Sequence, residues 1–397
     1  MFIQYRNLFR ATRFILLKLP SLLKFLARFR KTQNSLLVIK TDAIGDYILF
    51  RNFLEVLRSS QEYKNYKITL LGNELWQDIA LKYDSDFVDH FIFIRKNDLY
   101  EQPLSTLKLG WRLFKNNYSV VLQPSYTRQL ITDGLAALTA GRHIIGFESD
   151  NEGIVPRYKL KTDQFYTQKL TLPASSYFEF SRSAFFFETV LNCPVNVSSP
   201  YISVNKFING GIVVFPGAGV SKRRWEKEKF LALIKLICLH TSQTIYLAGR
   251  QQEAETGDYL MQNLSPERVQ NLIGQTTLPQ LIDLIGNATL VIANETSAIH
   301  IAAATKTKSV CILGGGHFER FAPYTTPTVH NPVCISEKMA CYNCNWTCKF
   351  AINAGDSFPC VSAVSVDNVW QATLPLLATL PSVAEDQEAG IIQMVPA

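Results

Sequence analysis

Short apolar runs alternate with segments of helical periodicity along most of this chain of 397 residues. Each run is bounded by turn-forming residues, which is typical of a strand buried in a parallel sheet. Strands and helices that alternate at these lengths predict a doubly wound α/β fold. In the first half of the chain we expect strands at 36–40, 67–71, 91–94, 119–122 and 143–147, and helices at 47–58, 76–82, 104–114, 129–139 and 178–190.

The same alternation restarts after the stretch 192–209, which is rich in Pro, Ser and Asn. We therefore expect two Rossmann-like domains, residues 35–195 and 206–380, that face each other across a cleft and bind ligands beyond the carboxyl ends of their strands. The polar, irregular stretch 148–175 is a candidate acceptor loop, and 381–397 is expected to be a mobile tail. The second half is expected to have strands at 211–215, 244–248, 290–293 and 309–313, and helices at 227–239, 278–285, 297–304 and 366–380.

The net charge of +7 belongs to the first 34 residues. This arm has eight basic residues and no acidic one, so the rest of the chain carries about −1 by the same count and shows no nucleic-acid footprint. Large apolar side chains such as Phe9, Phe14 and Phe29 lie between the charges, which favours an amphipathic segment at a membrane surface. A helix packed on the body of the protein is the alternative. A cleaved signal peptide is not expected, because Lys18 interrupts the short apolar run 14–19.

A tight loop after the first expected strand ends in Gly45 and Asp46. Glycine permits a tight turn, and Asp46 then stands at the start of a helix. An aspartate at this position can cap the helix, or it can act as a general base if it faces the cleft. Asp42 is a second carboxylate in the same loop and competes for that role.

A glycine-containing loop follows the first strand of the second half and lets the backbone approach a diphosphate closely. Basic residues come next, and they supply the positive charge that a departing nucleoside diphosphate needs. A solvated basic loop is the alternative. The residues of this candidate donor site are Gly217, Ala218, Gly219, Lys222, Arg223 and Arg224.

A second candidate phosphate site follows the strand 290–293 and opens a helix, whose first N–H groups and dipole suit an anion. Its residues are Glu295, Thr296, Ser297, Ala298 and His300. His300 lies one turn after Thr296, although a lone histidine is more often a satisfied core residue. Glu253, after the strand 244–248, could hold ribose hydroxyls or be a solvated acid at a helix start.

Four of the eight cysteines are clustered near the C-terminus, at Cys341, Cys344, Cys348 and Cys360. One C-x-x-C pair with two further thiols could form a structural zinc site. The spacing is not that of two C-x-x-C knuckles, so free or disulfide-paired thiols are the alternative.

Four segments, in this order, resemble glycosyltransferase family 9, the ADP-heptose:lipopolysaccharide heptosyltransferases. They are 37–46, 214–225, 271–278 and 293–304. The resemblance extends from residue 36 to about 375 and leaves the N-terminal arm outside. It implies a GT-B fold, an inverting reaction and a site that requires no metal or other cofactor.

The resemblance also implies roles for particular residues. The matching aspartate of the family is the proposed general base, which assigns that role to Asp46 rather than Asp42. Arg223 stands where family members commonly have Lys, and keeps the positive charge. Glu295 and Ser297 depart from the usual Asp and Gly, which leaves phosphate binding in place and the donor sugar open.

Together these features predict transfer of a heptose-like sugar from a nucleoside diphosphate donor, such as an ADP-heptose, to a lipopolysaccharide or other surface-glycan acceptor. Residues 1–34 would hold the enzyme on the cytoplasmic face of the bacterial inner membrane. A nucleotide-sugar epimerase or hydrolase of the same fold is one alternative, and a non-catalytic sugar-nucleotide binding protein is another. The arm favours the transferase, because an epimerase has no lipid-linked acceptor to find.

Overall fold

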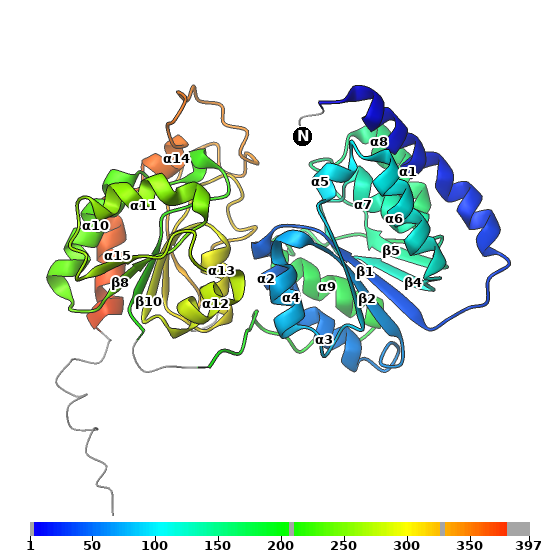
Figure 1. Ribbon diagram of the computed structural model, residues 1–397, viewed down its shortest axis with the longest axis horizontal. Helices are drawn as coiled ribbons and strands as arrows, with labels where there is room; N and C mark the ends of the chain where they lie inside the picture. The colour runs from blue at the N-terminus through cyan, green and yellow to red at the C-terminus, as the bar shows by residue number, and fades with distance from the viewer. Residues whose placement is uncertain (1–3, 206–209, 326–329, 379–397) are drawn as a thin grey trace, which may run out of the picture. The chain divides into compact units, whose positions relative to one another are not determined.

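The computed structural model describes residues 4–205, 210–325 and 330–378. The chain divides into two compact units, Met1–Pro200 (unit 1) and Tyr201–Ala397 (unit 2) (Figure 1). The division falls in the stretch rich in Pro, Ser and Asn that separates the two predicted halves. The predicted tail, 381–397, lies outside the described residues.

Unit 1 is a six-stranded parallel sheet in the order β3-β2-β1-β4-β5-β6, with helices on both faces (Figure 1). Every residue of the central strand β1 is buried, as its unbroken apolar run predicts. The strands are β1 (Ser35–Lys40), β2 (Lys67–Asn73), β3 (His90–Ile94), β4 (Val120–Gln123), β5 (His143–Phe147) and β6 (Gln168–Leu170). The helices are α1 (Arg6–Ala27), α2 (Ile44–Phe50), α3 (Asn52–Ser59), α4 (Gln77–Tyr83), α5 (Lys96–Leu99), α6 (Pro103–Lys115), α7 (Leu130–Leu138), α8 (Pro156–Thr162) and α9 (Glu179–Leu191), with 3₁₀ turns η1 (Glu74–Trp76) and η2 (Asp163–Phe165).

Unit 2 is a second six-stranded parallel sheet, in the order β12-β11-β10-β7-β8-β9. Counted from its own first strand, this is the same strand order as in unit 1. The strands are β7 (Ile212–Phe215), β8 (Ile245–Leu247), β9 (Val269–Asn271), β10 (Leu290–Asn294), β11 (Ser309–Ile312) and β12 (Val333–Ile335). The helices are α10 (Lys227–His240), α11 (Ala254–Met261), α12 (Leu278–Asn287), α13 (Ser297–Ala304), α14 (Pro359–Ser362) and α15 (Val366–Ala378), with 3₁₀ turns η3 (Ser221–Arg223) and η4 (Gln251–Glu253).

Each sheet has one point where the strand order reverses direction, between β1 and β4 in unit 1 and between β7 and β10 in unit 2. In doubly wound sheets, ligands bind at the carboxyl edge beside such a point. The predicted doubly wound α/β architecture is confirmed. Every candidate site motif, the cysteine cluster apart, follows or adjoins a central strand of its sheet.

The stretch 148–175 is not the irregular loop that its composition suggests. Pro156 begins the helix α8, a position where proline is favoured, and β6 then adds an edge strand to the sheet. Tyr158, Tyr166 and Leu170 are buried and join the core of unit 1. Isolated aromatic side chains among polar residues anchor this segment in the core. Because they form no apolar run or helical periodicity, the sequence did not indicate a helix or strand here.

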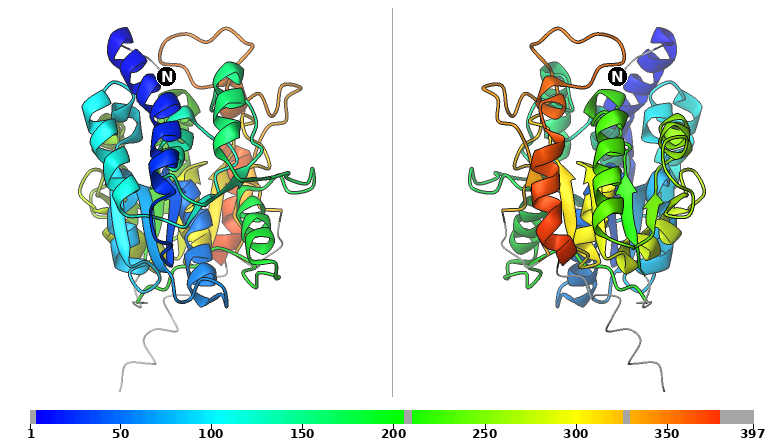
Figure 2. Two further views of the ribbon diagram at one scale, coloured as in Figure 1. Left: turned by 90° about the vertical axis from the view of Figure 1, so that its right-hand side faces the viewer. Right: turned by 90° about the vertical axis from the view of Figure 1, so that its left-hand side faces the viewer.

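The basic arm contains the helix α1, which runs along the outside of unit 1 (Figure 2). It packs against α6 and α7 with Leu16 and Leu23, both of which are buried. Gly134 in α7 permits the close approach, because a Cβ there would lie 2.6 Å from the Leu16 side chain. One side of the arm is therefore packed on the body of the protein, as the alternative interpretation expected. Within the described residues, no helix is long and apolar enough to cross a membrane.

Candidate functional site

The loop after β1 holds a network of charges at the switch point of unit 1. Asp42 lies 3.0 Å from the buried Lys40 ammonium and 3.8 Å from that of Lys96, and Ser125, after β4, donates a hydrogen bond to it. Burial alone would raise the pKa of Asp42, but the two ammonium groups and the serine hydroxyl outweigh it and hold the pKa well below its usual range. Asp42 is therefore a tightly bound counter-ion.

Asp46 lies in the first turn of α2, directly after the same loop, and is partly exposed. Burial would lower the pKa of Lys40, but Asp42, Glu179 and Asp46 together raise it. One buried ammonium thus balances three carboxylates. Of the two aspartates in this segment, Asp42 is engaged in ion pairs and Asp46 has the weaker tie to Lys40.

The switch point of unit 2 is held together by Asn294, the last residue of β10. Its Nδ2 donates to the carbonyl oxygens of Pro216 (2.8 Å) and Gly217 (3.0 Å), and its Oδ1 accepts from the backbone N–H of Trp225 (2.9 Å). These bonds fix the glycine-containing loop after β7 beside the start of α13. The two candidate phosphate segments therefore lie together, as predicted.

Arg223, Glu295 and Thr296 carry unsatisfied polar atoms at this point. Among the described residues, Arg223 Nε, Glu295 Oε2 and Thr296 Oγ1 are buried without a hydrogen-bond partner. The Arg223 guanidinium lies over the ring of Trp346, 4.1 Å from its centroid. Buried polar groups are normally satisfied, so three of them together indicate a place for a polar ligand.

The carboxyl group of Glu295 has an unusual charge state. Burial raises its pKa to about 8, although the nearby Arg223 guanidinium acts in the opposite direction. At neutral pH the group is therefore largely protonated and can donate a hydrogen bond. A neutral acid does not repel a diphosphate as a carboxylate would.

The N-terminus of α13 is open toward the same place. Thr296 is the N-cap residue, with φ −146° and ψ 178°, but its side chain does not bond the first turn of the helix. The N–H groups of Ser297 and Ala298 therefore keep their donor capacity at the positive end of the helix dipole, whereas that of Ile299 donates to the Thr296 carbonyl. Both properties suit an anion.

Glu253 is fully buried and ion-paired, so it is not the solvated acid that was one alternative. Its Oε1 accepts from Arg224 (3.1 Å) and Arg250 (3.0 Å), and its Oε2 accepts from the backbone N–H of Arg250 (2.7 Å). Gly217 leaves room for this carboxylate, since a Cβ there would lie 2.8 Å from it. Arg224 is thus committed to the protein.

Two further predicted donor residues, His300 and Lys222, differ in how far they are buried. His300 is buried, its Nδ1 lies 2.8 Å from the Tyr324 hydroxyl, and burial lowers its pKa to about 4. It is a neutral core histidine, which was the alternative weighed from the sequence. Lys222 lies in the turn η3 and is partly exposed, as a cation that meets a ligand should be.

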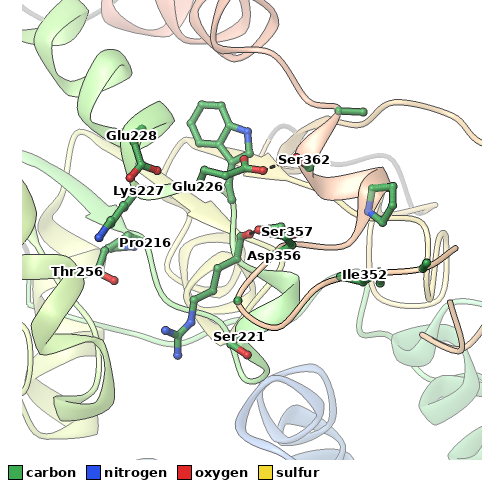
Figure 3. A pocket seen from close by; sticks show the side chains of 16 residues that line it. Pro216, Ser221, Glu226, Lys227, Glu228, Thr256, Ile352, Asp356, Ser357 and Ser362 are labelled. Atoms are coloured by element: carbon green, nitrogen blue, oxygen red, sulfur yellow. Dashed lines mark hydrogen bonds between the residues drawn. The ribbon is translucent and has the colours of Figure 1, made fainter.

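A cavity of about 760 Å³ adjoins this site in unit 2. Figure 3 shows Lys227, Glu228 and Thr256 on one side of it and Asp356 and Ser357 on the other. Its charges are of both signs, in contrast to the cationic loop at Arg223. Of the predicted donor residues, Arg224 alone lines it.

The cysteines of the predicted zinc site all lie in unit 2. Cys341, Cys344 and Cys348 are partly exposed, and all eight cysteines, which lie in described segments, are free thiols. Cys360 lies in the first turn of α14 and accepts a hydrogen bond from the N–H of Gly315 at 3.4 Å. Among the described residues no group of three or more His, Cys, Asp or Glu is placed to hold a metal ion. The free-thiol alternative fits the structure, and zinc stays a prediction.

Three residues with structural roles at the site were missed from the sequence. Asn294 and Arg250 organise the loops, and Trp346 lies against Arg223. Asn294 had a signal, because a buried strand that ends in a polar residue needs partners for it. Trp346 had none, since its partner is distant in sequence.

Two Rossmann-like units in one chain are the architecture of GT-B glycosyltransferases. A model of glycosyltransferase family 9 (heptosyltransferase) matches residues 107–349, more than half of the chain. The chain belongs to this family.

The individual relatives have low sequence identity to this chain or match only part of it. Lipooligosaccharide heptosyltransferase 2 of Haemophilus influenzae is 30% identical over 104 residues, which cover 25% of this chain and 30% of that protein. Among solved structures, E. coli ADP-heptose LPS heptosyltransferase II is similar with a TM-score of 0.65 at 17% identity, over 87% of this chain and 98% of that one. A family 9 glycosyltransferase of Veillonella parvula gives 0.67 at 16% identity, over 88% and 99%. At such identities the structural likeness shows the fold alone.

Proposed function

We propose that this chain is an inverting, metal-independent glycosyltransferase. It moves a heptose-like sugar from a nucleoside diphosphate donor, such as an ADP-heptose, to a lipopolysaccharide or other surface-glycan acceptor. Membership of family 9 supports the class of reaction. The observation that carries the donor assignment is the group of unsatisfied polar atoms on Arg223, Glu295 and Thr296 at the open end of α13.

The donor's diphosphate binds to this group in unit 2. Arg223 and Lys222 neutralise the charge that develops as the nucleoside diphosphate leaves, and the N–H groups of α13 add donors directed at the phosphate oxygens. Protonated Glu295 contributes an O–H where an ionised carboxylate would oppose binding. Because side chains and helix dipole supply the positive charge, the reaction needs no metal ion.

Asp46 is the general base in unit 1. It takes the proton from the acceptor hydroxyl, whose oxygen attacks the anomeric carbon from the side opposite the leaving diphosphate, so the configuration inverts. The ion pairs of Asp42 exclude it from this role, since a carboxylate of depressed pKa is a weak base. Lys40 forms an ion pair with Asp42, and the charge of Asp46 also acts on Lys40 and raises its pKa.

A transfer assay tests the proposal directly. The purified chain is incubated with ADP-heptose and lipopolysaccharide precursors that lack heptose, with and without EDTA. Heptosylated product of inverted configuration, formed equally well with EDTA, is expected. Free heptose without acceptor would indicate a hydrolase, an isomerised nucleotide sugar an epimerase, and donor binding without any turnover a binding protein.

Peripheral attachment to the cytoplasmic face of the inner membrane is the second part of the proposal. One side of α1 packs on unit 1, but an apolar stripe along α1, formed by Phe14, Leu22 and Phe25 of the helix and by Phe29 just after its end, is exposed on another side. These residues are three, four or eight positions apart and so share a helix face. Phe14 is 66% exposed and Phe29 80%. Exposed aromatic side chains among basic residues suit the interface of an anionic bilayer.

A further inference from the structure

A cavity of about 360 Å³ lies between α1 and α8 of unit 1 and is surrounded by positive charge. None of the residues that line it is acidic. The basic ones come from both helices, which lie side by side in Figure 1. They are Arg10, Arg13, Lys18, Arg157 and Lys161.

Two guanidinium groups meet on one neutral atom at this cavity. Arg13 donates to the Tyr158 hydroxyl at 2.7 Å, and Arg157 donates to the same oxygen at 3.1 Å. Burial would raise the pKa of Tyr158, but the two guanidinium groups outweigh it and lower the pKa. The phenol orients both cations without neutralising either.

Other cations of unit 1 are arranged differently. Arg51 is ion-paired with Asp84 at 2.8 Å, and Lys159 of α8 is ion-paired with Asp163 at 2.9 Å. Arg13, Arg157 and Lys161 line one cavity. Within the residues that the structure describes, none of these three side chains forms an ion pair. Cations that gather around one cavity without acidic residues give it a positive potential, so this arrangement fits an anionic ligand.

Apolar side chains lie at the edge of the same cavity. Phe14, the first member of the apolar stripe of α1, lines it together with Leu17. Leu160 of α8, next to Lys161 in sequence, is 71% exposed. Basic groups around a hollow with apolar groups beside it match the layering of phosphates and acyl chains at a bilayer surface.

We infer that the cavity between α1 and α8 is a binding site for the phosphate of an anionic phospholipid headgroup. Arg13 and Arg157 contact the phosphate oxygens through their planar forks, and Lys161 and Arg10 add charge from the two sides. The apolar stripe enters the acyl boundary beside it. This inference rests on the membrane part of the proposed function and adds a defined headgroup site to it.

The test compares two pairs of charge-removing substitutions in the full chain. Arg157→Gln with Lys161→Gln removes two exposed cations of the cavity. Lys64→Gln with Lys67→Gln removes two exposed cations of unit 1 that do not line it. Binding is measured at low salt to vesicles of phosphatidylcholine alone and of phosphatidylcholine with phosphatidylglycerol. Thermal melting confirms that each variant is folded.

The unaltered chain should bind the phosphatidylglycerol vesicles and not the neutral ones. The cavity pair should weaken that binding on the order of 30-fold, whereas the control pair should weaken it about threefold or less. Equal losses in both pairs would mean a diffuse field and overturn the headgroup site, while membrane attachment stands. Failure of the unaltered chain to bind would overturn both. Full displacement from vesicles by millimolar inorganic phosphate would show a site for the free ion and overturn the inference.

Discussion

Asp42 and Asp46 lie on one short segment, yet their surroundings give them different chemistry. Asp42 is held by Lys40, Lys96 and Ser125, and the depressed pKa of its carboxyl makes it a poor proton acceptor. Asp46 lies four residues later, in the first turn of α2, and raises the pKa of Lys40 less than Asp42 does. At the scale of single residues, the structure thus distinguishes two carboxylates that the spacing leaves as competitors.

The first prediction separates these two aspartates by substitution. Asp46→Asn should lower turnover about 100-fold or more with donor binding retained, because a general base is lost without change of shape. Asp42→Asn should mainly lower stability, since it removes the ion-pair partner of the buried Lys40. Steady-state kinetics, calorimetry with ADP and chemical denaturation give the three readouts. Near-normal turnover of Asp46→Asn would remove Asp46 from the mechanism.

The second prediction concerns Glu295 and pH. Its folded-state pKa, about 8, exceeds the ordinary value of 4.5, so the folded protein holds this proton more tightly than the unfolded chain. The resulting stabilisation is fully present below pH 4.5 and is lost as the pH rises through about 8. Glu295→Gln, which cannot ionise, should be less sensitive to pH over that interval.

Denaturation midpoints across this range measure the effect, with Glu228→Gln as an exposed control that should follow the unaltered chain. If Glu295→Gln and the unaltered chain lose stability in parallel, Glu295 is already ionised at neutral pH. The proton donor proposed for the diphosphate would then be absent.

How much of the site the sequence predicts depends on how local its parts are. Gly217, Arg223 and Thr296 stand at strand-to-helix junctions, and junction chemistry is readable from neighbouring residues. The bonds of Asn294 to Pro216 and Gly217 span 78 and 77 residues, and no local pattern encodes such a pairing.

Among the elements, the central strands were predictable, whereas β3 is the single edge strand of the two described sheets that was predicted. Unbroken apolar runs mark β1, β7 and β10 because both faces of a parallel sheet are covered. The edge strands β9 and β12 have three residues each and are partly exposed, so they carry too little pattern. The predicted helix 47–58 is interrupted at Arg51, whose guanidinium bonds the buried Asp84.

The helix α1 shows the same limit, because its apolar residues lie on more than one side. The sequence does not tell which side packs, since the close contact depends on Gly134 in α7.

The third prediction follows from the contact of Leu16 with Gly134. Leu16→Ala should destabilise the protein by about 2–5 kcal/mol, because a buried leucine leaves a cavity. Phe14→Ala, on the exposed side, should change stability by about 0.5 kcal/mol or less.

Urea denaturation compares the stability of the two variants. Their affinity for vesicles should rank in the opposite order. Leu16→Ala should keep the apolar stripe and bind vesicles, whereas Phe14→Ala should bind them more weakly. If Leu16→Ala left stability unchanged, the packing of α1 on unit 1 would be wrong, and the arm would be an independent appendage.

At the scale of the whole molecule, the two units have the same strand order and separate cores, but different chemistry. All predicted donor residues belong to unit 2. The proposed base and the basic arm belong to unit 1. A repeated architecture thus carries the proposed diphosphate-binding loop in one unit and the proposed general base in the other, each at its own switch point.

The fourth prediction is that this division survives separation of the units. Unit 2 has a core that includes Trp225, Phe230 and Trp370, so a protein of residues 201–378 should fold alone. Because Arg223, Glu295 and the start of α13 are all within it, that protein should bind ADP with an affinity within about tenfold of the full chain. Calorimetry measures the affinity, and Arg223→Ala in the same protein should weaken it. A folded unit 2 that does not bind ADP would place essential donor contacts in unit 1, and the assignment of the diphosphate to the loops of β7 and β10 would then be insufficient.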